Sequence, residues 1–202
     1  MENIPSPSRK RLVLLGRLLA GYSESQITSQ RIEELTGWSA PQVRRDISLL
    51  GVKCGASNGY KVSELKKALS SLLGQDGQTK KCCIVGLGRM GQRLLESTEL
   101  DDSAFVLVAG FDSNVNRTEV LRSSFPLHPT TKLAQVIKEE GIEFAILTVG
   151  VEEAQSIASH LSECGIKGIV NYTPCMLSVP EGVAVENVCL LTALELLSAS
   201  SS

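Results

Sequence analysis

The sequence predicts an α/β protein in three segments: a small helical unit, a Rossmann-like doubly wound parallel sheet, and a final helix. Nearly continuous apolar runs alternate with stretches of helical periodicity in residues 79–188, a pattern typical of parallel strands buried on both faces. A glycine-rich turn directly follows the first of these runs. Residues 1–78 carry 11 Lys and Arg against 7 Asp and Glu, whereas the remainder carries 9 against 15. We therefore expect domains at 1–78 (including a linker), 79–188 and 189–202.

The first segment reads as helices with one hairpin among them. A helix is expected over 6–20, with an apolar stripe of leucines at helical spacing, and Gly21 ends it. A short helix over 30–35, capped by Ser29, precedes the turn at Gly37 and a helix over 39–50. The Gly- and Asn-rich stretch 51–62 predicts a wing hairpin, 63–73 a further helix, and 74–78 the linker. This order predicts a winged helix-turn-helix.

The third of these helices is the candidate recognition helix. Ser39 is its expected cap, and Pro41 lies in its first turn, where a missing N–H costs nothing. Arginine forks onto guanine or phosphate and glutamine reads adenine, so a basic unit of this kind favours a DNA partner, although a solvated helix face also explains the basic residues. The candidate DNA-binding residues are Arg11, Arg17, Ser39, Gln42, Arg44, Arg45, Ser48 and Lys53.

The glycine-rich turn Gly86-x-Gly88-x-x-Gly91 follows a short buried strand over 82–85 and opens a helix. In such a turn the first glycine permits the tight bend, the second lets the backbone approach a pyrophosphate, and the third lets helix and strand lie close. Free N–H groups at the start of the helix favour phosphate. Alone this triplet is a weak signal, because glycine-rich turns are common.

The second apolar run, 105–111, strengthens the signal because Asp112 ends it, 21 residues beyond Gly91. A Rossmann fold places there the carboxylate that accepts hydrogen bonds from the adenosine ribose, and it would repel a 2′-phosphate. The expected cofactor is therefore NAD(H) and not NADP(H). The alternative is a flavodoxin-like or CoA-binding α/β domain in which Asp112 merely caps a loop.

The alternation continues with a helix over 131–140, a strand over 144–149, a helix over 151–164 and a strand over 168–171. Ligands of parallel sheets bind beyond the carboxyl ends of the strands, which places Thr148, Val149, Asn171 and Thr173 beside the cofactor; the alternative is that these residues only shape their own loops. The candidate cofactor-binding residues are Gly86, Leu87, Gly88, Arg89, Met90, Gly91, Asp112, Thr148, Val149, Asn171 and Thr173.

The last helix, over 190–197, is apolar on most sides, so we expect a second subunit to cover it. No apolar run is long enough to span a membrane and no apolar signal core begins the chain, which predicts a cytoplasmic protein without a membrane partner. The six cysteines lack the paired spacing of a metal site, so we expect no metal. We expect their thiols to be buried and reduced.

Taken together in this order, these motifs resemble the Rex family of redox-sensing transcriptional repressors. The resemblance covers nearly the whole length and is carried by 43–46, the wing, 86–91, 111–112, 146–149, 165–174, 177–183 and 185–188. It implies a homodimer that binds double-stranded operator DNA through two winged helices and responds to the NADH/NAD⁺ ratio, with NADH weakening DNA binding. It also implies that the C-terminal helix is exchanged between subunits.

Two alternatives remain open at this point. Ser97 and Cys189 stand where the family usually has a tyrosine and an acidic residue, which leaves a DNA-binding regulator without NADH control as one of them. The other is an NAD-dependent dehydrogenase. Against catalysis, the sequence offers no obvious acid or base, since the only histidines are His128 and His160. We therefore expect no catalytic residues.

Overall fold

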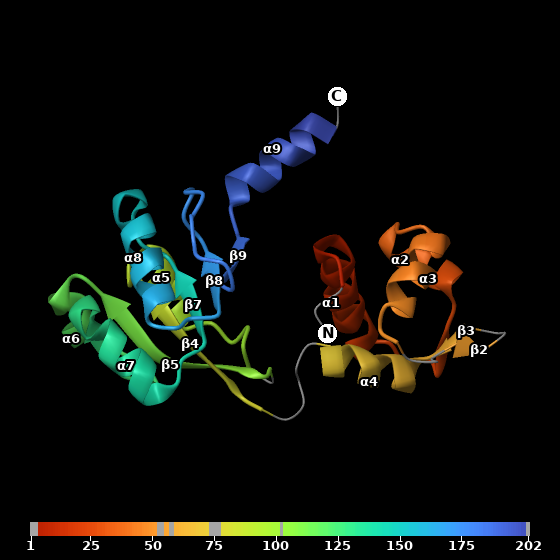
Figure 1. The fold of residues 1–202 in the computed structure, drawn as a ribbon, viewed down its shortest axis with the longest axis horizontal. Coiled ribbons are helices and arrows are strands. Elements are labelled where there is room, and N and C mark those ends of the chain that lie inside the picture. Colours follow the sequence, from red (N-terminus) through yellow and green to blue (C-terminus); the bar gives the residue numbers. More distant parts are fainter. Residues whose placement is uncertain (1–3, 52–54, 57–58, 73–77, 102, 201–202) are drawn as a thin grey trace. The chain divides into compact units, whose positions relative to one another are not determined.

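The computed structural model describes residues 4–51, 55–56, 59–72, 78–101 and 103–200. The chain divides into two compact units, Met1–Gln78 and Thr79–Ser202, and each is described by itself (Figure 1). The expected linker lies, apart from Gln78, outside the described residues, as do Lys53 and the tip of the expected wing.

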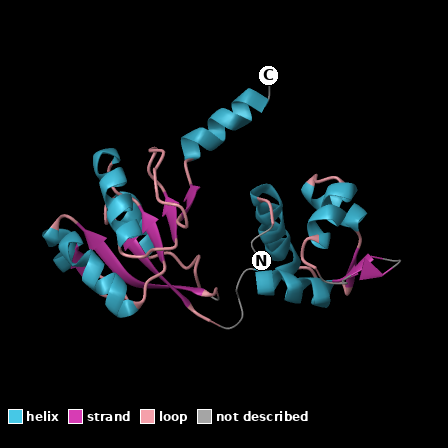
Figure 2. Cartoon of the chain, viewed as in Figure 1, coloured by secondary structure: helices cyan, strands magenta, loops and turns pink. Residues whose placement is uncertain are grey.

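The described residues of the first unit form four helices and a small antiparallel sheet, and Figure 2 shows how helices and strands follow each other. Its sheet has the strand order β1-β3-β2, so a two-residue strand that was not expected from the sequence pairs with the hairpin. The elements are α1 (Ser6–Ala20), β1 (Gln26–Ile27), α2 (Ser29–Thr36), α3 (Ala40–Ser48), β2 (Gly55–Ala56), β3 (Gly59–Lys61) and α4 (Val62–Leu72). The helices fall where the periodicity predicts them, and the winged helix-turn-helix arrangement is confirmed.

One core holds this unit together. The leucine stripe of α1 packs with apolar residues from α2, α3 and α4, because each helix presents one apolar face. Leu19, Ile32 and Leu65 are completely buried, and burying an aliphatic side chain of this size contributes about 1.5–3 kcal/mol.

The caps of α2 and α3 differ from those expected. Thr28, not Ser29, is the N-cap of α2, and its Oγ1 accepts a hydrogen bond from the N–H of Arg31 at 3.0 Å. At α3, Ser39 holds the N-cap position without a side-chain cap bond. Instead the Glu33 carboxylate accepts from the N–H of Ala40 at 3.1 Å. A carboxylate from the preceding helix therefore satisfies the N-terminus of α3, a contact that local sequence cannot reveal.

The second unit is a six-stranded sheet with strand order β6-β5-β4-β7-β8-β9, and every pair is parallel. This is the doubly wound order, with the switch between β4 and β7, which confirms the Rossmann-like fold. The elements are β4 (Lys80–Val85), α5 (Arg89–Leu95), β5 (Phe105–Asp112), α6 (Val115–Val120), β6 (Leu127–Pro129), η1 (Thr130–Lys132), α7 (Leu133–Glu140), β7 (Phe144–Leu147), α8 (Val151–Glu163), β8 (Gly168–Asn171), β9 (Ala184–Asn187) and α9 (Leu190–Ser200).

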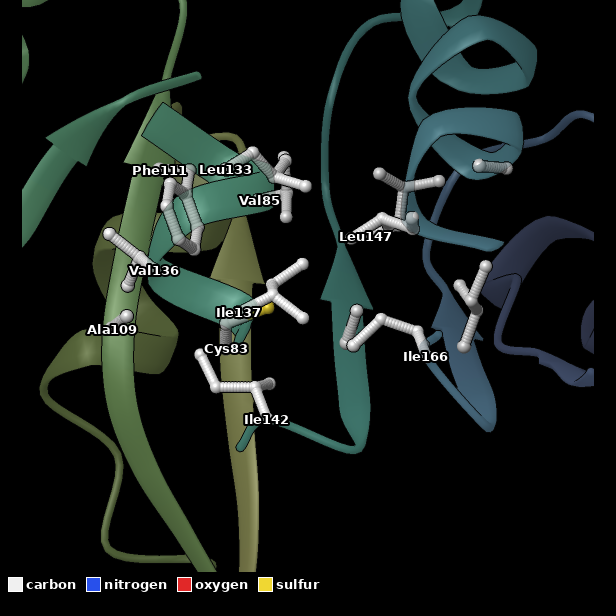
Figure 3. Packing of buried hydrophobic residues seen from close by; sticks show 14 of the residues in the cluster. Cys83, Val85, Ala109, Phe111, Leu133, Val136, Ile137, Ile142, Leu147 and Ile166 are labelled. Carbon is white, nitrogen blue, oxygen red and sulfur yellow. The ribbon is translucent and has the colours of Figure 1, made fainter. Parts of the chain in front are cut away.

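The core of this unit lies between the sheet and the helices α7 and α8. Figure 3 shows Leu133, Val136 and Ile137 of α7 packed against Val85 and Phe111 of the sheet. Each of these side chains is at most 7% exposed. These contacts hold α7 against β4 and β5 near the carboxyl ends of the two strands.

The adjacent cysteines of β4 are both buried and free, as expected. Cys83 belongs to the core beneath α7, and Cys82 is on the opposite face because strand side chains alternate. Burial raises the pKa of the Cys82 thiol to about 11, and it raises that of Cys83 still further. Both thiols are therefore protonated and inert at neutral pH.

Three elements of this unit, α6, β6 and β9, were not expected as elements from the sequence. All three are short, and the two strands pair through the backbone at the edges of the sheet, where no apolar run is required. The final helix α9 is present as predicted, and none of its residues is buried. Its exposed leucines are Leu190, Leu191, Leu194, Leu196 and Leu197.

Candidate functional site

A cavity of about 400 Å³ opens at the carboxyl ends of β4, β5 and β7, at the point where the strand order reverses. Ligands of doubly wound sheets bind at this position. The glycine turn, Asp112 and the β7–α8 loop all contribute to it. The lining residues are Gly86, Gly88, Asp112, Ser113, Arg117, Thr130, Thr148, Val149, Gly150, Glu152, Glu153, Ser156 and Ile157.

The three glycines of the turn differ in what requires them. Gly86 has φ +98°, and a Cβ there would lie 2.8 Å from the backbone of Thr148. A Cβ on Gly91 would lie 1.9 Å from the carbonyl oxygen of Gly86, so only glycine lets α5 approach the turn. Gly88, by contrast, has φ −71°, and a Cβ there would meet no atom within 4 Å. Nothing in the described residues explains the absence of a side chain at this cavity-lining position.

Thr148 fixes the turn from the neighbouring strand. Its Oγ1 donates to the carbonyl oxygen of Gly86 at 2.5 Å, and its backbone N–H donates to that of Val85 at 2.8 Å. The hydroxyl therefore donates its hydrogen bond to a group of the protein itself. Thr148 lines the cavity as predicted, but it also positions the glycine turn.

The Asp112 carboxylate is 3% exposed and is held by three donors. Its Oδ2 accepts from the N–H of Leu87 at 2.6 Å, and its Oδ1 from the N–H of Asn114 at 2.7 Å. Arg117 Nη1 lies 3.3 Å from Oδ2 and 3.4 Å from Oδ1. Asp112 thus links the end of β5 to the glycine turn, and it carries an ion pair that the sequence analysis did not anticipate.

The structure places the predicted cofactor residues Asn171 and Thr173 outside the cavity lining. Asn171 and Thr173 are buried, and Asn171 donates to Cys175 O at 2.8 Å and to Asn187 Oδ1 at 2.9 Å. Its Oδ1 accepts from both the N–H and the hydroxyl of Thr173. This network closes the loop after β8 and connects it to β9. Buried amides must be fully bonded, so the two residues serve the loop's own structure.

Within the turn itself, the side chain of Leu87 is completely buried. Arg89 and Met90 are exposed in the first turn of α5, where backbone N–H groups have no intrahelical partner. Val149 lines the cavity as predicted. The cavity residues that were not predicted follow β5 and β6 or belong to α8: Ser113, Arg117, Thr130, Glu152, Glu153, Ser156 and Ile157. Ligands of parallel sheets bind beyond the carboxyl ends of the strands, so the predicted strand ends could have identified the segments that follow them as candidates.

In the first unit, the predicted recognition helix α3 exposes the side chains expected to face solvent. Gln42, Arg44, Arg45 and Ser48 are all exposed, as are Ser39 before the helix and Arg17 on α1. Arg44 donates to Ser29 Oγ at 2.9 Å, which connects α3 to α2 across the helix-turn-helix. The surface of α3 therefore offers two guanidinium groups and one amide. The predicted contact Lys53 lies outside the described residues.

Arg11, predicted as a DNA contact, forms an ion pair within the first unit. Its Nε lies 2.6 Å from Asp46 Oδ2 and its Nη2 lies 2.9 Å from Asp46 Oδ1, a two-bond ion pair between α1 and α3. Burial of Asp46 opposes its ionisation, but hydrogen bonds from Arg11 and Ser8 hold its pKa below the usual value. A lone buried carboxylate would be costly, so the ion pair with Arg11 stabilises Asp46 and holds α3 against α1.

Other site types find no support in the part of the chain that the structure describes. No cluster of three or more His, Cys, Asp or Glu side chains there is arranged to hold a metal ion. No described helix combines the length and the apolar character needed to cross a bilayer.

Comparison with known proteins gives two family matches within the chain. Residues 77–175 match the family described as "CoA binding domain", and residues 3–48 match the family described as "Putative DNA-binding protein N-terminus". The first description names the architecture that the sequence analysis kept as an alternative. The two matches fall in the two compact units.

Solved structures of a Rex-family repressor are similar to this chain over 99% of its length. The crystal structure of RSP, a Rex-family repressor, in complex with β-NAD⁺ and operator DNA has a TM-score of 0.90 at 29% identity, covering 99% of this chain and 93% of that one. RSP in complex with β-NADH has a TM-score of 0.86 at 29% identity, covering 99% and 95%.

Curated relatives are similar over the same extent. The redox-sensing transcriptional repressor Rex of Limosilactobacillus reuteri is 32% identical over 199 residues, which cover 97% of this chain and 92% of that protein. The Rex protein of Listeria welshimeri is 32% identical over 197 residues, or 96% of this chain and 91% of the relative. With this identity over nearly its whole length, the chain belongs to the Rex family of redox-sensing transcriptional repressors.

Proposed function

We propose that the chain is a transcriptional repressor that binds operator DNA through its first unit and NAD(H) through its second, and that NADH weakens the DNA complex. In this proposal residues 1–78 are the DNA-binding domain, 79–188 the nucleotide-binding domain and 189–202 the dimerisation segment. The chain acts in the cytoplasm and catalyses no reaction. Support for the last point is that the relatives similar to this chain are transcriptional repressors.

The observation that carries the nucleotide assignment is Gly88. The protein's own atoms require glycine at Gly86 and Gly91, but leave open space at Gly88 beside the cavity. A ligand that approaches the backbone closely there accounts for this glycine, and a pyrophosphate at the start of a helix is such a ligand. RSP, with TM-scores of 0.90 and 0.86 to this chain, is a Rex-family repressor solved with β-NAD⁺ and with β-NADH.

The exposed surface of α3 supports the DNA assignment. Gln42, Arg44 and Arg45 project from one helix whose other face is buried, so they are available to the major groove together. The Arg11–Asp46 ion pair holds that helix against α1. One chain therefore carries a DNA-binding surface in its first unit and a ligand site in its second.

The dimer rests on α9. Five leucines of this helix are between 54% and 77% exposed, an apolar surface that a soluble chain covers with a partner. We propose that the cover is a second copy of the chain, as the Rex resemblance implies. Two copies present two recognition helices, which suits a DNA site with two half-sites.

Repression controlled by NADH requires that the ligand bind the DNA-free form more tightly than the DNA-bound form. The test uses duplex DNA selected from a random pool by the purified full-length chain, with binding followed by fluorescence anisotropy. NADH and NAD⁺ are titrated separately into the complex. The proposal expects NADH to release the DNA at concentrations where NAD⁺ does not. Equal DNA affinity with saturating NADH and without it would contradict the proposal.

A further inference from the structure

The edge of the cavity where β5 ends carries an ion pair, and its cation has no role in the account given so far. Arg117 lines the cavity and contacts both oxygens of Asp112. We propose that Arg117 determines how the site treats the 2′ position of the adenosine ribose, by neutralising Asp112 and by attracting a 2′-phosphate itself. This inference rests on the proposed binding of a nicotinamide dinucleotide.

Asp112 by itself is a weak source of repulsion for a 2′-phosphate. Its side chain is 3% exposed, and each oxygen already accepts a short hydrogen bond from a backbone N–H. The guanidinium of Arg117, at 3.3 Å, balances the remaining charge. The sequence analysis expected Asp112 to repel a 2′-phosphate, whereas the structure shows a carboxylate that is buried and paired with a cation.

The local backbone fixes Arg117 in this position. The chain turns immediately after β5 because the N–H of Asn114 bonds back to Asp112. Asn114 is then the N-cap of α6, with its side chain accepting from the N–H of Asn116 at 3.0 Å. Arg117 follows in the first turn of α6, so its side chain lies over the end of β5. The pairing therefore follows from the capped turn.

The charges around the cavity decide the direction of the effect. Among the described residues that line it, Arg117 is the cation, and the carboxylates are Asp112, Glu152 and Glu153. The two glutamates occupy the first turn of α8, where they oppose the attraction of that helix terminus for an anion. Arg117 is 47% exposed, so its guanidinium is accessible to a ligand.

A 2′-phosphate brings close to two negative charges into this edge, whereas a 2′-hydroxyl brings none. Arg117 attracts the phosphate, whereas Glu152 and Glu153 add negative charge to the same cavity and oppose its binding. Removing Arg117 takes away the attraction and also leaves the charge of Asp112 unbalanced. Both effects disfavour NADPH, and neither acts through charge on the 2′-hydroxyl of NADH.

The experiment measures dissociation constants of NADH and NADPH for the full chain by nicotinamide fluorescence and calorimetry. The quantity of interest is the ratio of the NADPH constant to the NADH constant. We expect Arg117→Gln to raise this ratio at least about fivefold, and Arg117→Lys to stay closer to the original chain because it keeps the charge. The double substitution Glu152→Gln with Glu153→Gln should lower the ratio.

The matched control is Arg122→Gln, which removes the same charge from an exposed residue outside the cavity lining and should leave the ratio unchanged. The inference is overturned if Arg117→Gln leaves the ratio within about twofold of the original, or if the glutamate variant moves it in the same direction. Failure of the proposed function gives a different result, since the unmodified chain would then bind neither dinucleotide.

Discussion

Substitution of alanine at Gly88 separates ligand binding from folding. The new Cβ meets no protein atom within 4 Å, and the backbone φ of −71° suits any residue. Replacing glycine stabilises by about 0.4–1 kcal/mol through the unfolded chain, whereas alanine is the poorer N-cap by a similar amount. We therefore expect a net change in unfolding free energy within about 1 kcal/mol, which moves the Tm by a few degrees at most.

The same methyl group occupies the space through which a pyrophosphate would approach the turn. Overpacking of this kind costs about 1–3 kcal/mol, so the dissociation constant for NADH should rise about 5- to 150-fold. The matched control is Gly91→Ala, whose Cβ would lie 1.9 Å from the carbonyl oxygen of Gly86. That variant should unfold at a clearly lower temperature, because helix and turn must separate.

The assay combines calorimetric unfolding with a titration of NADH for both variants of the full chain. Wild-type affinity in a stable Gly88→Ala chain would refute the reasoning, because the open space at Gly88 would then have no connection with a phosphate. Loss of stability at Gly88 comparable to that at Gly91 would refute the steric reading of the turn.

Three further substitutions and one labelling experiment test other parts of the structure. Arg11→Met should destabilise the first unit by about 3 kcal/mol by leaving Asp46 buried without its cation, and the fluorescence of the single tryptophan, which lies in this unit, reports the loss. Because the pKa of Asp46 is lowered below 3.8 in the folded state, its contribution to stability is present above about pH 4 and is lost as the pH falls through the folded pKa. Acid unfolding of Asp46→Asn should lack this component, and an unchanged acid profile would speak against the ion pair. Iodoacetamide at pH 8 should label Cys189, whose pKa a hydrogen bond with Thr192 lowers, before Cys82, whose pKa is about 11, and peptide mass spectrometry reads the order. Leu194→Asp on the exposed face of α9 should shift sedimentation towards the monomer, and an unaltered sedimentation coefficient would remove α9 from the dimer interface.

The elements that the sequence predicted well are those whose signal is local. Helices such as α1 and α8 carry an apolar face at helical spacing, and strands such as β4 and β5 are short apolar runs. Each pattern is written in consecutive residues, so no distant contact is needed to recognise it. The short elements α6, β6 and β9 lack such patterns and form because a neighbouring strand or turn supplies their hydrogen bonds.

The amino-acid sequence by itself determined the two-unit organisation, the glycine turn and the position of Asp112, because spacing along the chain encodes these features. Only the tertiary structure decided which charged and polar side chains pair with one another inside the protein. Arg11 and Asp46 are 35 residues apart, and Asn171 finds Asn187 across two parallel strands, so their pairing depends on packing. For Arg117 and Asp112 it depends on the capped turn that follows β5. The sequence alone does not show whether a charged or polar side chain is free to bind a ligand. Burial with a hydrogen-bonding partner is what makes it part of the protein interior.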